Sequence, residues 1–578
     1  MKTKWFAIGC FVSIILAFLF IFGIFFSLGR MSRSYSQKRY TSIAKPSYLH
    51  LKISGQLAEY NEMSENPLFK LPEETREIIA KLNQASGDDN IIGLVIEPGL
   101  IMCGYSTLHE LNLAIEDFRD SGKKVYACLE RAMTKDYLLA ARADSIFLNP
   151  SASAGIILSG IGGSVLFYKD LLDKLGIEFT VIHAGEYKGA GENFSRRNFS
   201  PPVKKNLETL YDDFYRNILD DLATAREFTP AEVKYLFESR DELFINQQKA
   251  LDYGLVDGLM NRDQLTEHLG ISKKELIPIS KYRLTTAEKP GFQKIAVVYA
   301  QGEISEIENN YSESILSAGK IDKIISSLEK DSAVKAIVLR VNSPGGSALE
   351  SEKIHACLSR IKSRIPLIVS MGNVAASGGY YISAPADYIF ADPFTITGSI
   401  GVAALFPNFQ KMGEKIGLST DKITRGKFHN LFDPWNKPDP NTIVAIKQNI
   451  EDVYVEFKSR VAAGRSLSLE EVEELARGQV WSSSKALDNK LIDETGTLQD
   501  AIAKAAELAG LVSYKVAWYP KKLSLFEKIL QDKFGSSLLS SDLTALLLTE
   551  EERRNLEISL WNIRNNPVQS RLLIQIRE

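Results

Sequence analysis

The chain consists of two similar halves, and this internal duplication restricts its fold more than any other feature of the sequence. Matching segments occur in the same order in both halves: 50–56 with 297–303, 91–99 with 337–345, 143–150 with 386–393, and 249–257 with 485–493. The offset between matched positions drifts only from 246 (344 − 98) through 243 (387 − 144) to 236 (493 − 257). This slow drift indicates a tandem pair of like domains rather than a short-period solenoid.

Each half alternates apolar runs typical of buried strands with helical patterns, which favours α/β units with largely parallel pairing. In the second half, Ser347 and Glu350 have the spacing of a capping box that would open a helix ending near Ser363. We therefore predict two α/β domains, at 47–289 and 292–515, joined at a turn-like Lys-Pro-Gly sequence. The remaining tail, 521–578, is rich in leucine, and we expect it to be helical or to form an oligomer contact.

The composition excludes several classes of function. The chain has 578 residues, enough for more than one domain, and its net charge of −3 gives no reason to expect binding to nucleic acid. The four cysteines are scattered without CxxC spacing, and the six histidines form no HExxH motif. We expect neither a catalytic metal nor a cofactor.

The N-terminal segment Trp5–Gly29 contains no charged residue and is almost wholly apolar. At about 1.5 Å per helical residue it would span the roughly 30 Å hydrocarbon core of a bilayer. Its end lacks an Ala-x-Ala-like cleavage site, so we interpret it as an uncleaved transmembrane anchor. Two lysines precede the segment and four basic residues follow it, and these flanking charges alone would place the bulk of the protein in the cytoplasm.

Two segments of the second half carry the parts of an acyl-transfer site. Ser377 follows a strand-like run at 366–370 and lies among alanines and glycines too small to shield it. Gly345 and Gly346 follow another strand-like run, and glycines let a backbone approach a ligand closely. We predict Ser377 as a nucleophile, with the amides of Gly345 or Gly346 and of Gly378 directed at the developing negative charge.

The halves differ at these positions. By the offset of 243, Ser377 corresponds to Thr134, and by the offset of 246, Gly346 corresponds to Leu100, so the first half cannot host the same reaction alone. It carries instead Lys188 among small residues, where the second half has His429. A serine needs a base, and desolvation can hold a lysine neutral.

Lys188 and His429 are therefore two candidate bases. If the duplication divided the labour, Ser377 should meet Lys188, and Thr134 should meet a His429-like position in a dead site. The sequence leaves open whether Lys188 reaches Ser377 within one chain or between chains.

Three elements together resemble the long, duplicated form of signal peptide peptidase A: Ala375–Tyr381, Ser343–Gly346, and Gly185–Lys188 with Glu192. The resemblance covers about residues 47–515 and the N-terminal span. It implies two crotonase-like, Clp-protease-like domains and a Ser/Lys peptidase in which Ser377 is the nucleophile and Lys188 the general base.

The resemblance further implies a single-pass protein of the bacterial inner membrane, with its catalytic domains facing the periplasm. It also implies a homotetramer that contacts membrane lipid and degrades signal-peptide fragments. This orientation opposes the one that the flanking charges favour. We adopt it because such an enzyme must reach peptides left in the membrane after export.

Two other functions remain open from the residues. A crotonase-fold acyl-CoA enzyme would direct the same glycine amides at a thioester oxyanion, but it would need a nucleotide site and has no use for a membrane anchor. An inactive scaffold would retain the fold alone, and the presence of both Ser377 and Lys188 argues against it.

Overall fold

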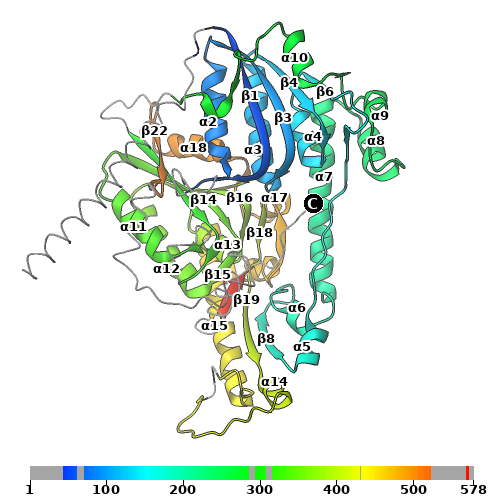
Figure 1. Cartoon of the computed structure of the whole chain (residues 1–578). Coiled ribbons are helices and arrows are strands. Elements are labelled where there is room, and N and C mark those ends of the chain that lie inside the picture. Colours follow the sequence, from blue (N-terminus) through cyan, green and yellow to red (C-terminus); the bar gives the residue numbers. More distant parts are fainter. Residues whose placement is uncertain are drawn as a thin grey trace, which may run out of the picture.

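The structure is a computed structural model of the chain. The residues that it describes are 43, 45–61, 71–284, 293–306, 315–429, 431, 433–522 and 568–571. Each half of this described chain forms its own sheet, and Figure 1 shows the first sheet in blue above the second in green. The predicted tandem α/β arrangement is confirmed.

The first sheet is parallel throughout its main path. Its strand order is β10-β1-β3-β4-β6-β9, with β2 (Glu73–Glu74) beside β1. The strands span β1 Ser47–Ala58, β3 Ile91–Met102, β4 Lys124–Leu129, β6 Ser145–Leu148, β9 Gly258–Leu259 and β10 Leu276–Pro278.

The second sheet repeats this order as β22-β11-β14-β16-β17-β21, again with parallel pairing. Its strands span β11 Lys294–Gln301, β14 Val334–Ser343, β16 Leu367–Ala376, β17 Tyr388–Ala391, β21 Glu494–Thr495 and β22 Lys515–Tyr519. The C-terminal end of β16 pairs with β18 (Ile396–Gly398) instead of β17. Strand β18 pairs in turn with β20 (Val480–Ser482), which runs antiparallel to it. The last strand of this sheet extends past the predicted domain end at 515.

Corresponding helices cover the two sheets. In the second half α12 (Ala348–Lys362) begins after Ser347, whose side chain accepts a hydrogen bond from Glu350 N, so the helix predicted there is confirmed. Its counterpart is α3 (Tyr105–Asp120). Two helices of 26 residues, α7 (Pro201–Arg226) and α15 (Pro440–Arg465), follow the region of the site in each half.

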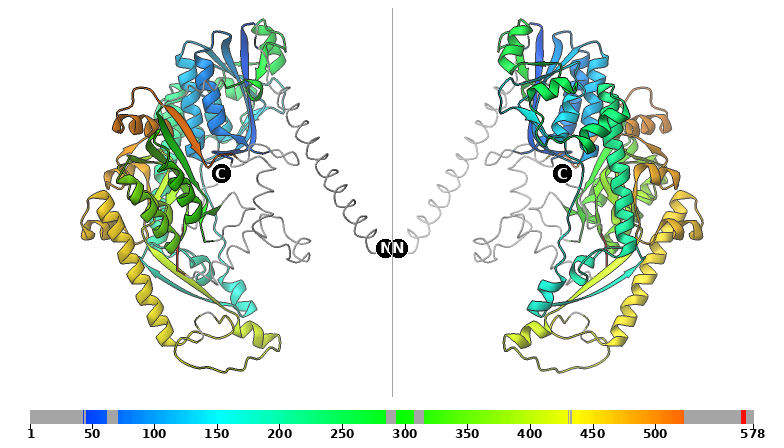
Figure 2. Two further views of the ribbon diagram at one scale, coloured as in Figure 1. Left: turned by 90° about the vertical axis from the view of Figure 1, so that its left-hand side faces the viewer. Right: turned by 90° about the vertical axis from the view of Figure 1, so that its right-hand side faces the viewer.

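A buried charge cluster joins the two halves. The Arg340 guanidinium, on β14, lies 3.2 Å from Glu59 and 2.9 Å from Glu110, both from the first half. His109 lies 2.7 Å from the buried carboxylate of Asp392, and this contact raises the pKa of His109 although burial opposes the shift. These contacts fix the packing of one half on the other, and Figure 2 shows that packing from both sides.

A third sheet lies at the end of the second half away from the first sheet (Figure 1), with the order β13-β12-β15-β23-β19-β8. Its strands span β8 Glu178–Ala184, β12 Glu303–Ile304, β13 Ile315–Leu316, β15 Gly345–Ser347, β19 Val402–Asn408 and β23 Val568–Arg571. The antiparallel pair β8–β19 brings a first-half strand beside a second-half strand. Within the tail expected to be helical, 568–571 is a strand, and 523–567 lies outside the described residues.

No helix in the described part of the chain has the length and apolar character required to cross a bilayer. The anchor predicted at residues 5–29 lies outside the described residues.

Candidate active site

Ser377 lies at the junction between β16 and the short helix α13 (Gly378–Ser383), with φ 57° and ψ −118°. A side chain rarely adopts this backbone conformation, which costs on the order of 1–3 kcal/mol and occurs mainly at functional sites. The surrounding structure holds it there, because Ser377 N donates to Gly398 O at 2.8 Å and Tyr381 N donates to Ser377 O at 2.9 Å. Ser377 is fully buried.

Lys188 and Ser377 come together within one chain, which the sequence had left open. The distance from Lys188 Nζ to Ser377 Oγ is 2.6 Å. Lys188 follows β8 in the first half, and β8 pairs along its length with β19 of the second half. This pairing places Lys188 beside Ser377.

The structure adds Ser399 as a third member that the sequence analysis missed. Lys188 Nζ donates to both the carbonyl oxygen and the hydroxyl of Ser399, each at 3.1 Å. The sequence contained a signal for it, because Ser399 corresponds to Ser159 at an offset of 240, between the matched offsets of 243 and 236. In the structure Ser159 forms hydrogen bonds with Thr134 in the first half. The same serine therefore accompanies the nucleophile position in both halves.

Burial lowers the pKa of Lys188 from its ordinary value to about 7. Its amine forms hydrogen bonds with two hydroxyl groups and one carbonyl oxygen, and these three partners carry no charge. Glu192, singled out near it in the sequence, accepts instead from Ser200 N at 2.9 Å. A neutral amine beside a serine hydroxyl is the chemical requirement for a general base near neutral pH.

Glycines let the loop that carries Lys188 pack against the second half. A Cβ on Gly185 would lie 2.3 Å from the Arg477 carbonyl carbon, and one on Gly478 would lie 2.5 Å from Lys188 N. Both glycines also have positive φ. Tyr187 N donates to Arg477 O at 2.8 Å. This backbone hydrogen bond fixes the loop that carries Lys188 independently of the lysine side chain.

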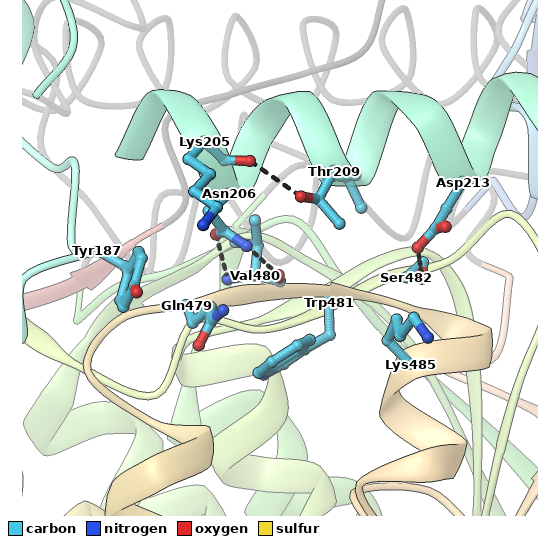
Figure 3. A pocket seen from close by; sticks show the side chains of 11 residues that line it. Tyr187, Lys205, Asn206, Thr209, Asp213, Gln479, Val480, Trp481, Ser482 and Lys485 are labelled. Carbon is cyan, nitrogen blue, oxygen red and sulfur yellow. Dashed lines mark hydrogen bonds between the residues drawn. The ribbon is translucent and has the colours of Figure 1, made fainter. Parts of the chain in front are cut away.

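Asn206 on α7 fixes the strand that supports this loop. Its side-chain amide donates to Val480 O and accepts from Val480 N, both at 2.9 Å (Figure 3). The neighbouring residue, Gln479, accepts from Ser399 N at 2.6 Å. Asn206 is therefore connected to Ser399, which holds Lys188, through its hydrogen bonds to Val480, the covalent link from Val480 to Gln479, and the hydrogen bond from Ser399 N to Gln479 O.

The predicted oxyanion glycines also lie together. A Cβ on Gly378 would fall 3.2 Å from Gly345 Cα, so the two turns are in close contact. Gly345 N donates to Ser343 Oγ at 3.2 Å, and this amide is already engaged. Gly346 has φ 154°, and a Cβ there would meet Ile304 O at 2.0 Å, so the neighbouring strand β12 requires this glycine.

The corresponding turn of the first half is closed by a side chain. Asp136 corresponds to Gly379 by the offset of 243, and its carboxylate is fully buried. It accepts hydrogen bonds from Leu100 N at 3.1 Å and from Ile101 N at 2.9 Å. Leu100, which corresponds to Gly346, keeps a positive φ of 56°. The first half thus retains the turn, but the side chain of Asp136 fills it.

The two remaining candidates do not meet in the chain. Thr134 Oγ1 bonds Ser159, accepting from its N–H at 2.9 Å. His429 is exposed, and its Nδ1 lies 3.4 Å from Gly426 O. Within one chain, Lys188 is therefore the candidate base that reaches Ser377.

The arrangement assembles a serine hydroxyl, a desolvated amine and a glycine-rich turn from both halves. The chain is 32% identical to "Protease 4" of Haemophilus influenzae over 563 residues, covering 90% of each chain. It is 31% identical to "Protease 4" of Salmonella typhi, covering 94% of this chain and 92% of the relative. Against "Serine protease SPPA, chloroplastic" of Arabidopsis thaliana the identity is 30%, covering 83% of this chain and 72% of the relative.

Two family descriptions also match. "Clp protease" matches residues 302–390, the part that contains Ser377. "Peptidase family S49" matches residues 117–275 and 359–512, once in each half and together over more than half of the chain. Both halves therefore derive from one peptidase domain, and the chain belongs to peptidase family S49, in its long, duplicated form.

Proposed function

We propose that this serine protease uses Ser377 as its nucleophile and Lys188 as its general base. The observation that carries the proposal is the 2.6 Å separation of Lys188 Nζ and Ser377 Oγ, with the pKa of the buried amine lowered to about 7. A neutral amine has two N–H groups and one lone pair. The two N–H groups match the two acceptors on Ser399, which leaves the lone pair for the Ser377 hydroxyl.

The proposed reaction begins when the neutral amine of Lys188 takes the Ser377 proton as Oγ attacks the peptide carbonyl. The resulting ammonium returns this proton to the leaving amine, which departs and leaves an acyl-enzyme. Water then attacks the acyl group, with Lys188 again accepting and returning a proton, and Ser377 is regenerated. Lys188 Nζ takes part in every one of these proton transfers.

We assign the oxyanion donors to the amides of Gly346 and Gly378. Gly378 is the first residue of α13, and the first amides of a helix have no partner within it. Gly345 was a third candidate, but the hydrogen bond to Ser343 Oγ engages its amide. Its role in the proposal is to shape the turn.

For the substrate we propose apolar signal-peptide fragments bound in an extended conformation. A cavity of about 60 Å³ lies beside the base, lined by Lys188 and Ser399, by apolar side chains that include Phe199, Val203 and Leu207, and by the polar side chains of Glu192, Asn193 and Asn206. The apolar part of this lining suits a small apolar residue at the cleavage position. A clear preference for charged residues there, measured with a set of matched peptides, would contradict this assignment.

We also propose that residues 5–29 anchor the protein in the bacterial inner membrane, with the catalytic halves facing the periplasm, and that the protein is a homotetramer. Protease added to spheroplasts is expected to cut the large domain, whereas full protection would favour the orientation given by the flanking charges. The mass of the detergent-solubilised protein tests the tetramer, and a monomeric active enzyme would rule it out.

A fluorophosphonate probe tests the central assignment. We expect it to label Ser377, and we expect Ser377→Ala to abolish both labelling and peptide hydrolysis while leaving the far-ultraviolet circular dichroism unchanged. An inactive scaffold or an acyl-CoA enzyme would give no labelling at Ser377. Near-normal hydrolysis by the purified Ser377→Ala protein would overturn the nucleophile assignment.

A further inference from the structure

A second cavity lies next to the one that contains the base. It has a volume of about 160 Å³ and lies between α7 of the first half and the segment 479–485 of the second half, as Figure 3 shows. Tyr187, Asn206 and Val480 line both cavities, so these three residues form a common wall. The proposed chemistry at Ser377 makes no use of this second cavity.

Part of the lining of the second cavity is apolar or aromatic. Leu210 and Val480 are buried there, and Tyr187 and Trp481 are partly exposed beside them. Trp481 Nε1 donates to Leu475 O at 3.0 Å, which holds the indole in place. An apolar cavity of about 150 Å³ holds a benzene ring. The second cavity therefore has room for one large side chain of a ligand.

The acid that lines the second cavity is already engaged. Asp213 lies about two turns after Lys205 on α7, at the other end of the cavity in Figure 3. Its Oδ2 accepts from the Ser482 hydroxyl at 2.7 Å, and its Oδ1 lies 3.2 Å from Arg216. Asp213 is the one acidic residue among those that line the cavity. The charge of this carboxyl group is thus matched without a ligand.

Two lysines also line the second cavity. Lys485, in the short helix α17 (Ser483–Asp488), lies 3.3 Å from Asp488. Figure 3 shows Lys205 at the other end of the cavity, where its side chain extends from α7 toward the opposite strand. Among the described lining residues, the charge that remains to be matched is that of Lys205. This end of the cavity favours an anionic group, and the aromatic part favours an apolar side chain beside it.

We propose that the second cavity binds the C-terminal residue of a peptide, with the carboxylate at Lys205 and the side chain against Leu210 and Trp481. A serine protease releases a peptide with a new C-terminal carboxylate in every turnover, so ligands of this class form next to the cavity. A hydrogen bond between an ammonium and a carboxylate is charge-assisted, and an amide cannot replace the carboxylate in it. The site is separate from Ser377, so the proposal goes beyond the proposed function and holds whichever residues cut the peptide.

A comparison of two peptides tests the carboxylate. The detergent-solubilised full-length Ser377→Ala protein is titrated with fluorescent Ala-Ala-Leu that ends either in a free carboxylate or in an amide. We expect the acid to bind about fivefold more tightly, the upper end for a partly exposed ion pair. Lys205→Gln should remove this difference. Lys204→Gln is the matched control and should keep it, because Lys204 lies 3.7 Å from Glu208 and does not line the cavity. Equal affinities of acid and amide, or a preference for the acid that survives Lys205→Gln, would overturn the proposal.

Two further ligands test the class of molecule. Ala-Ala-Gly with a free carboxylate should bind severalfold more weakly than Ala-Ala-Leu, because it has no side chain to place against Trp481. Inorganic phosphate should displace the labelled acid much less effectively than unlabelled Ala-Ala-Leu does. Equal affinities of the glycine and leucine peptides, or equal displacement by phosphate, would indicate a general anion site and overturn the assignment to a peptide.

A blocked active site separates the second site from the proposed chemistry. In protein with Ser377 intact, the Kd of the Ala-Ala-Leu acid should be the same before and after reaction with the fluorophosphonate probe. Loss of binding after labelling would place the peptide in the substrate groove and overturn the second site. If the probe fails to label Ser377, the proposed chemistry is rejected, while the comparison of Lys205→Gln with Lys204→Gln still decides whether the second cavity binds the carboxylate.

Discussion

Lys188 and Ser377 are separated by 189 positions in the sequence, yet Nζ of the first lies 2.6 Å from Oγ of the second. The two residues belong to different halves of a duplicated chain. Neither half contains both groups, so a site that uses both of them requires the two copies of the domain.

The pH dependence of hydrolysis should follow the titration of Lys188. Burial lowers its pKa to about 7, and only the neutral amine can accept the Ser377 proton. We therefore expect kcat/KM to rise with pH and to level off above an apparent pKa near 7, far below that of a free lysine. A pH–rate profile between pH 5 and 9 provides the measurement. A rate that is flat over this range would contradict the assignment.

Replacing each candidate base distinguishes them. Lys188→Ala should lower kcat by about 10²- to 10⁴-fold, the usual contribution of a general base. His429→Ala should leave most of the activity, because His429 is exposed and does not meet Ser377 within the chain. The reverse result, with Lys188→Ala active and His429→Ala dead, would mean that a Ser/His site operates in the second half.

Ser399→Gly tests whether the second serine orients the base. Ser399 has φ 52°, a conformation that glycine adopts without strain, so the substitution removes the hydroxyl and leaves the backbone carbonyl. Loss of one hydrogen bond, about 0.5–1.5 kcal/mol, should lower kcat several-fold. Because the hydroxyl accepts from the ammonium, its loss should also shift the acid limb of the pH profile to lower pH. An unshifted profile would reduce Ser399 to a packing role.

Asn206→Ala should loosen the strand that supports the Lys188 loop, although Asn206 forms its hydrogen bonds with Val480 and not with Lys188. It would leave Val480 N–H and C=O without the partners they have in the structure, at about 1–3 kcal/mol for each buried group. We expect a lower free energy of unfolding and slower labelling of Ser377 by the fluorophosphonate probe. Thr209→Ala is the matched control on the same face of α7, since its hydroxyl bonds only Lys205 O within the helix. Equal labelling rates for the two variants would contradict a positioning role.

Lys188→Met should stabilise the fold in a pH-dependent way. Below pH 7 the Lys188 amine is protonated in both the folded and the unfolded chain, and its buried charge destabilises the folded chain. Between pH 7 and about 10.5 the amine is protonated only in the unfolded chain. The stability of the wild-type protein therefore rises with pH over this range. The gain in Tm of Lys188→Met over wild type should therefore be larger at pH 6 than at pH 9. The exposed Lys205→Met serves as the control, and a gain that does not change with pH would argue against a desolvated amine.

Much of the fold follows from the pattern of the sequence. The drifting offsets predicted a repeated domain, and the strand order of the first sheet recurs in the second. The helix after Ser347 was readable because a capping signal is local. Ser377 could be singled out by its local setting of small residues beside a second glycine turn, whereas the prediction of Lys188 rested on the difference between the two halves and on the family resemblance.

The remaining features depend on packing between segments far apart in the chain. Whether Lys188 reaches Ser377 within one chain depends on the pairing of β8 with β19 and on glycine contacts between residues 185 and 477. Ser399 could have been found only by carrying the drifting offset to a position with no motif of its own. The tail was expected to be helical or to form an oligomer contact. The strand at 568–571 could not be predicted, because a leucine-rich sequence does not reveal an edge elsewhere in the molecule to which a short segment can pair.

Asp136 fills the turn of the first half that corresponds to the glycine turn beside Ser377. Its side-chain oxygens accept hydrogen bonds from the amides of Leu100 and Ile101. Amides that are satisfied in the resting state can lower only the free energy of the folded chain. In the second half we propose that the matching amide of Gly346 instead donates to the oxyanion, a partner that forms only in the transition state. On this proposal one ancestral turn contributes to equilibrium stability in the first copy and to a rate in the second.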